Sequence, residues 1–136
     1  MLRFAIPCLL LLATGCAMTP EQSARADAVK ASDEAKLDRR LAGLSALPPV
    51  SCLDQRDANV TVYGNKLLYG DNGRYWLNQP TDGCFSSHNS DDIIVSKSYG
   101  PRLCSGDIIH TVSRAGGFQS GACSLGEFVP YRKPRS

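Results

Sequence analysis

The order of apolar and polar positions divides the chain into three parts of different character. Residues 4–12 form an apolar run interrupted only by Pro7, and residues 19–47 are rich in alanine and charged side chains. From Cys52 onwards, short runs of alternating apolar and polar residues are separated by turn residues, which is typical of β-strands. The sequence therefore predicts an apolar leader, a polar helix and a β domain.

The helical segment has a strong start and a short apolar stripe. Thr19 suits the N-cap, Pro20 the first helical position, and Gln22 completes a capping box. One side of the helix is apolar only near its end, at Leu37, Leu41 and Leu44, which is too brief for a coiled coil. We expect a solvated stalk within residues 16–49 that rests its C-terminal end on the domain. It would be ~40 Å long if helical as far as Pro48-Pro49.

The clearest hairpin signal is Asn72-Gly73, because a type I′ turn needs positive φ at both central residues. Centring the hairpin there pairs Tyr69 with Trp76 on one face. The other face then carries Leu68, Leu77 and Tyr75, with Gly70 opposite Tyr75, and Asp71 pairs with Arg74.

Further strands are expected at residues 92–97, 107–113 and 126–131, in addition to the alternating stretch 60–63. Ile108, His110 and Val112 share one face of their strand. Residues 114–121 contain three glycines and predict a flexible loop, and residues 132–136 predict a disordered basic tail. The fold class is all-β, a small barrel or sandwich of about six strands within residues 50–131.

The N-terminus has the parts of a secretory signal peptide over residues 1–15, with Arg3 before the apolar run. Ala13-Thr14-Gly15-Cys16 resembles a lipobox, which makes Cys16 the lipidated residue. The apolar run is too short to span a bilayer, which takes ~20 residues. Since residue 17 is Ala and not Asp, resemblance to lipoprotein sorting rules favours the periplasmic face of the outer membrane. The alternative is an ordinary secretory peptide, cut after Gly15 or Ala17, that leaves a soluble product.

Charge and cysteine content narrow the class of protein. The net charge of +2 gives no reason to expect nucleic acid as a partner. Besides Cys8 and Cys16 the chain has four cysteines, at positions 52, 84, 104 and 123, and four in a small exported domain predict two disulfides. Each would add ~3–4 kcal/mol, comparable to the net stability of such a domain.

From Cys52 to about Tyr131 the chain resembles an uncharacterised family of small exported proteobacterial proteins with a four-cysteine β domain. The matching segments are Ser51-Cys52-Leu53, Trp76-Leu77-Asn78, Cys84, Leu103-Cys104-Ser105-Gly106-Asp107 and Cys123-Ser124-Leu125-Gly126-Glu127-Phe128. The resemblance implies the pairings Cys52–Cys104 and Cys84–Cys123 and an exported location. It implies no activity, because the function of that family is unknown.

No motif for catalysis or metal binding is complete. Cys84, His88, Cys104, His110 and Cys123 lack the Cys-x-x-Cys spacing of a zinc site, and oxidised cysteines do not bind metal. Ser120 lies among glycines without a Gly-x-Ser-x-Gly elbow. Asp91-Asp92 lacks calcium-binding spacing, and Asp107 suits a turn carboxylate. We therefore expect no enzyme, no metal and no cofactor.

The expected function is a non-catalytic binding or accessory module of the envelope, held to a membrane by its lipid, whose partner is an envelope protein or polymer. Tyr69 and Trp76, with Arg74 beside them, are the candidate binding residues, because aromatic residues and arginine dominate binding hot spots. The alternative for Tyr69 and Trp76 is a place in the core. A second class of function is an inhibitor of wall-degrading enzymes, which would insert a serine or tyrosine on a protruding loop into the cleft of the enzyme, with residues 116–121 as the candidate loop.

Replacing Cys16 with Ser removes the thiol that accepts the lipid, so the variant should move from the membrane fraction to the soluble fraction. Fractionation followed by immunoblotting measures this, with Cys8→Ser as the control that stays with membranes. Retention of Cys16→Ser in the membrane fraction would contradict the lipobox interpretation.

Overall fold

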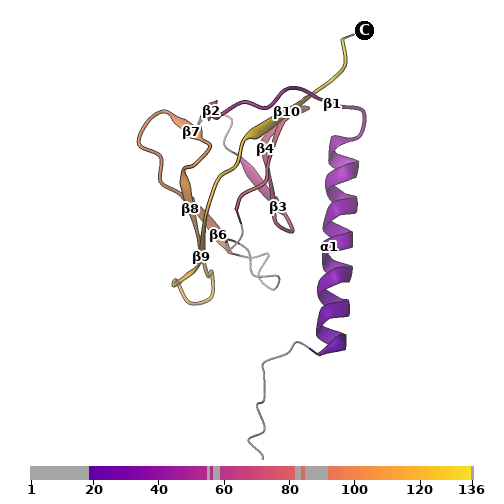
Figure 1. Cartoon of the computed structure of the whole chain (residues 1–136), viewed down its shortest axis with the longest axis vertical. Coiled ribbons are helices and arrows are strands. Elements are labelled where there is room, and N and C mark those ends of the chain that lie inside the picture. Colours follow the sequence, from indigo (N-terminus) through magenta and orange to yellow (C-terminus); the bar gives the residue numbers. More distant parts are fainter. Residues whose placement is uncertain (1–18, 55, 57–58, 82–83, 85–91, 136) are drawn as a thin grey trace, which may run out of the picture.

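The computed structural model describes residues 19–54, 56, 59–81, 84 and 92–135, and these form one helix and ten strands in three antiparallel sheets (Figure 1). The prediction of a mainly β fold is confirmed. The prediction of about six strands is wrong, and the described sheets do not close into a barrel. The elements are α1 (Pro20–Leu41), β1 (Ser45–Ala46), β2 (Cys52–Asp54), β3 (Val60–Tyr63), β4 (Lys66–Asp71), β5 (Arg74–Asn78), β6 (Ile93–Ser96), β7 (Arg102–Cys104), β8 (Ile108–Val112), β9 (Gln119–Ser124) and β10 (Phe128–Arg132).

Several predictions concern residues outside the described part of the chain. These are the signal peptide over residues 1–15, the lipidated Cys16, and the residues His88 and Asp91. Within the described part, no helix is long and apolar enough to cross a membrane.

Helix α1 begins with the predicted capping box. The Thr19 hydroxyl accepts from the Gln22 backbone N–H at 3.3 Å, and the Gln22 side chain accepts from the Thr19 N–H at 3.1 Å. The helix ends at Leu41 and not at Pro48, so the longer helix was a wrong prediction. Gly43 has a φ of +77°, which favours glycine, and the chain then enters the sheet as β1 beside β10.

The second half of α1 packs on the five-stranded sheet, as expected for its C-terminal end. Leu37 is buried against Leu68 and Tyr75. The part of α1 that contacts the sheet begins at Asp33, whose carboxylate accepts a hydrogen bond from the Gly64 N–H at 3.3 Å. Before Asp33, the helical side chains are exposed except for that of Ala26. The helix is therefore a covering layer over half its length and a projecting stalk over the other half.

The five-stranded sheet has the order β1-β10-β5-β4-β3, and its central hairpin has the predicted register. Asn72 and Gly73 have φ values of 49° and 80°, as a type I′ turn requires. Side-chain alternation gives the sheet two buried faces. One face packs on α1, and the other contributes to the main core, where Tyr69 meets Phe128 edge-on with ring centroids 5.5 Å apart.

Two smaller sheets, β2-β7 and β6-β8-β9, supply the rest of the main core. Both disulfide pairings implied by the family resemblance are confirmed. Cys52 and Cys104 are direct partners across β2 and β7, with Cα atoms 4.0 Å apart. Cys84 is joined to Cys123 of β9, with Cα atoms 4.9 Å apart.

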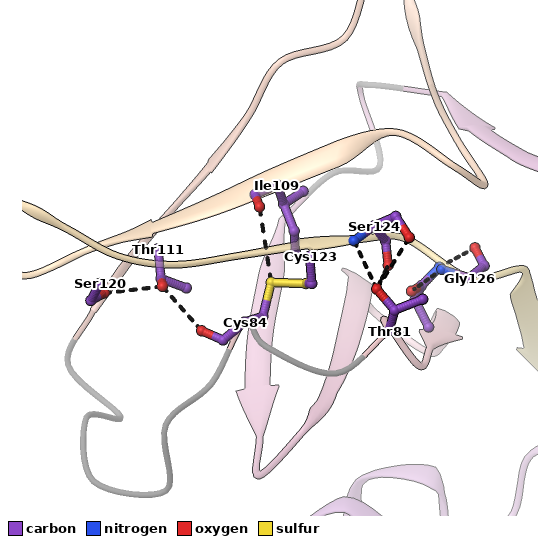
Figure 2. The surroundings of a disulfide bond; sticks show 9 residues. Thr81, Cys84, Ile109, Thr111, Ser120, Cys123, Ser124 and Gly126 are labelled. Atoms are coloured by element: carbon purple, nitrogen blue, oxygen red, sulfur yellow. Dashed lines mark hydrogen bonds between the residues drawn. A yellow bond between two sulfur atoms is a disulfide. The ribbon is translucent and has the colours of Figure 1, made fainter.

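Hydrogen bonds reinforce the second disulfide on both sides (Figure 2). The Thr111 hydroxyl donates to the Cys84 carbonyl at 3.0 Å. On the other side, the Thr81 N–H donates to the Ser124 carbonyl at 2.9 Å, and the Ser124 N–H donates to the Thr81 hydroxyl at 3.0 Å. The segment after β5 is thereby held against β8 and β9.

Replacing Leu37 with Ala should lower the free energy of unfolding by about 2–3 kcal/mol, because it leaves a cavity between α1 and the sheet. Val29→Ala is the matched control on the same helix, since Val29 is 53% exposed, and should change stability by less than about 0.5 kcal/mol. Denaturant unfolding under non-reducing conditions measures both. Equal, small effects would mean that α1 does not depend on the sheet.

Candidate functional site

The structure does not support the predicted binding surface around Tyr69. The Tyr69 side chain is only 2% exposed and lies in the main core, so no partner can reach it. Trp76 is half-buried against the same core, with the Arg132 guanidinium 4.1 Å above its ring. Arg74 is exposed at the start of β5. The core alternative is therefore correct for Tyr69, and Trp76 is largely a packing residue.

The residues considered for catalysis or metal binding are placed apart or already bonded. Cys84, Cys104 and Cys123 form disulfides, and the described residues contain no cluster of His, Cys, Asp or Glu able to hold a metal ion. Ser120 donates to the Asp92 carboxylate and shares a 3.0 Å hydrogen bond with the Thr111 hydroxyl. These contacts hold Ser120 within the sheet.

Among the described residues, two ionisable groups have clearly perturbed pKa values, and they lie in different parts of the structure. Burial raises the pKa of the Tyr69 phenol well above its usual value. Hydrogen bonds from Arg56, two from its guanidinium and one from its backbone, lower the pKa of the exposed Asp54 carboxyl. Asp54 therefore belongs to a surface ion pair.

The three-stranded sheet β6-β8-β9 has one buried and one exposed face. Ile109 and Thr111 point into the molecule and are buried. On the opposite face, here called the outer face, the register aligns Ile93 with Val112 and aligns Val95 with His110 and Ala122. Ile93, Val95 and Ile108 of this face are 42%, 40% and 46% exposed. Adjacent exposed aliphatic side chains of this kind mark interaction surfaces.

His110 lies at the centre of the outer face. It is half-buried, and its Nδ1 atom is shielded from solvent without a hydrogen-bond partner in the described part of the chain. Leaving a buried polar atom unpaired costs about 1–3 kcal/mol. His110 therefore does not stabilise the fold through Nδ1, and an aliphatic residue would suit the position better.

A pocket of about 360 Å³ opens at one end of the outer face. Its lining combines a cation, a phenol and an imidazole, and it includes no Ser, Thr or Cys among the described residues. The lining residues are Lys97, Tyr99, Gly106, Asp107, Ile108 and His110. The Asp107 carboxylate accepts from the Cys104 N–H at 2.7 Å, which confirms its prediction as a turn carboxylate. The pocket is open to solvent and is lined mainly by polar side chains.

The turn between β8 and β9 is shorter and better defined than the flexible loop predicted over residues 114–121. The Gly117 N–H donates to the Ser113 carbonyl at 2.8 Å, and the Ser113 N–H donates to the Phe118 carbonyl at 2.9 Å. Phe118 is 63% exposed. A Cβ atom on Gly116 would lie 2.4 Å from the Phe118 ring, so the aromatic ring packs directly over this glycine. The turn therefore presents an exposed aromatic side chain in a defined position.

Comparison of the chain with protein-family models, with curated proteins and with solved structures gives no match. The candidate site therefore rests on its own geometry. Strand alternation predicts the face shared by Ile108, His110 and Val112 but does not indicate that this face is the exposed one. The available signal was the run Ile93-Ile94-Val95, because consecutive β-branched residues place aliphatic groups on both faces of a strand.

His110 and its neighbour Thr111 should respond to substitution with opposite signs. His110→Leu removes an unpaired buried nitrogen and should raise the free energy of unfolding by about 1 kcal/mol. Thr111→Val leaves the Cys84 carbonyl without its donor and should lower the free energy of unfolding by about 1–2 kcal/mol. Denaturant unfolding measures both changes. A marked loss of stability in His110→Leu would show that the imidazole has a structural partner.

Proposed function

We propose that this protein is an exported, lipid-anchored envelope protein whose β domain binds another envelope protein without catalysing a reaction. The observation that carries the proposal is the outer face of β6-β8-β9, with its exposed aliphatic side chains and its poorly satisfied His110. The unpaired Nδ1 atom of His110 lowers the stability of the fold. A residue with such a cost at an exposed apolar surface is typical of a site that contacts a partner.

The proposed location is supported by the cysteines and by the N-terminal sequence. Two disulfides are typical of proteins that fold outside the reducing cytoplasm. The Ala13-Thr14-Gly15-Cys16 lipobox places the lipid a few residues before α1, and Ala17 favours the outer membrane, facing the periplasm. The resemblance to small exported proteobacterial proteins agrees with this location.

Binding rather than catalysis is supported by the hydrogen bonds of Ser120 and by the anchor. Ser120 is hydrogen-bonded to Asp92 and Thr111, which holds it within the sheet. No cofactor is needed for this proposal. A lipid anchor also confines the module to a thin layer, where even a weak contact with another envelope protein is populated.

The test is to place a charge on the outer face. Val95→Asp with Ile108→Asp should abolish cross-linking of the native lipoprotein to its protein partner, because a charge cannot be desolvated against an apolar surface. Thr61→Asp, at an exposed position of β3, is the matched control. Partner cross-linking through a photoreactive side chain at Val112 measures the effect, and circular dichroism verifies that the fold is retained. Unchanged cross-linking, or turnover of an envelope substrate, would contradict the proposal.

A second candidate function is inhibition of a wall-degrading enzyme, favoured by the exposed Phe118 on a defined turn. The sequence predicts a serine or tyrosine as the inserting residue. In the structure Ser120 is held within β9, so the proposed inserting residue is the exposed Phe118. In a wall-hydrolysis assay, Phe118→Ala should weaken inhibition by roughly thirtyfold, the effect of a hot-spot residue. Gln119→Ala is the neighbouring control. Absence of inhibition by the wild-type protein would eliminate this candidate.

A further inference from the structure

The start of β5 and the end of β10 lie side by side at one end of the five-stranded sheet. The end of α1 lies near the end of β10 (Figure 1), and these chain segments carry several basic residues. The register pairs Tyr131 with Tyr75, so the neighbouring residues Arg132 and Arg74 meet at the next position. The Arg40 guanidinium lies 5.2 Å from the centre of the Tyr75 ring, which brings the end of α1 to the same place. We call this region the basic end, and its members are Arg39, Arg40, Arg74, Arg132, Lys133 and Arg135.

The charge of the basic end differs from that of the remaining protein. Its six basic side chains are accompanied by two acidic ones, Asp38 and Asp71, which gives a local net charge of +4. The whole chain carries only +2, so the remaining residues are net acidic. A concentration of one sign at one end attracts a partner of the opposite sign and orients its approach.

Two of the guanidinium groups are held in place by aromatic rings. Arg132 donates to the Tyr75 and Tyr131 carbonyls at 2.9 and 2.8 Å while it lies over Trp76. Arg40 lies over Tyr75 on the opposite face of the sheet. Groups that are already ordered lose less entropy when a ligand binds. Five of the six basic residues are arginines, whose planar forks match carboxylates better than the point charge of lysine does.

We propose that the basic end binds a polymer that carries repeated carboxylate groups, of the kind present in cell-wall peptides. This inference rests on the proposed function in one respect. The proposed lipid anchor is the reason for choosing a polymer, and not a lipid surface, as the ligand of the basic end. The lipid anchor would precede Thr19, at the other end of a helix that is ~33 Å long at 1.5 Å per residue. The basic end therefore lies far from the anchoring bilayer, which favours a polymer located away from the membrane.

The experiment uses the full chain in detergent and its sedimentation with insoluble peptidoglycan. Arg39→Gln/Lys133→Gln/Arg135→Gln removes three exposed charges from the basic end and should weaken binding by about tenfold or more. Arg25→Gln/Lys30→Gln/Lys36→Gln removes the same charge from earlier turns of α1 and should change binding less than about twofold. Equal affinities for the two triple variants would overturn the proposal.

Three further arms identify the ligand chemistry. Peptidoglycan whose carboxyl groups have been amidated with a carbodiimide should no longer bind, and raised salt should weaken binding to native peptidoglycan. Vesicles of phosphatidylglycerol and phosphatidylcholine, tested with the Cys16→Ser variant without detergent so that neither the lipid anchor nor detergent contributes, should bind less than native peptidoglycan does. Binding to amidated peptidoglycan at full strength, or binding to the vesicles alone, would overturn the carboxylate-polymer assignment.

The outcome is separable from that of the proposed function. Val95→Asp/Ile108→Asp and Cys16→Ser should both bind peptidoglycan as the wild-type protein does, because neither change alters the basic end. Loss of peptidoglycan binding in either variant would contradict the proposal that the basic end binds independently of the outer face and of the lipid anchor. Retention of the Cys16→Ser variant in membranes would contradict the proposed lipid anchor, but it would not contradict peptidoglycan binding by the basic end.

Discussion

The structure depends on the register of the hairpin formed by β4 and β5, because this hairpin lies in a sheet that is buried on both faces. A shift of the register by one residue would turn Leu68 toward the main core and Tyr69 toward α1, so each side chain would lie in the wrong layer. The α1 face accepts Leu68, Tyr75 and Leu77, whereas the main core accepts Tyr69 opposite Phe128. Asn72 and Gly73 favour this register through their local backbone geometry.

The single helix of the described chain covers the five-stranded sheet, and this explains why the outer face of β6-β8-β9 is open. No described element packs over Ile93, Val95 and Ile108, although their strand neighbours Ile94 and Ile109 face the core. The disulfide between Cys84 and Cys123 joins this sheet to the segment that follows β5. A cross-link of this kind stabilises a small sheet that has only one buried face.

The outer face and the basic end suit different kinds of partner. The outer face is mainly aliphatic, so a partner must bury apolar surface against it. The basic end is polar and extends into a chain end with exposed Lys133 and Arg135, so its attraction acts over a Debye length and weakens with salt. If both proposed contacts form, each raises the effective concentration for the other.

The sequence by itself determined the features that depend on local backbone preferences and on cysteine content. The capping box at Thr19, the turn at Asn72-Gly73 and its register follow from dihedral preferences and short-range hydrogen bonds. The presence of two disulfides follows from an even cysteine count, although their pairing came from a family resemblance. Only the tertiary structure decided which strand faces are covered, because alternation defines two faces without saying what packs on either. Tyr69 is therefore buried while Val95 is exposed, and α1 ends early because the chain beyond Gly43 pairs with β10, a partner far away in the sequence.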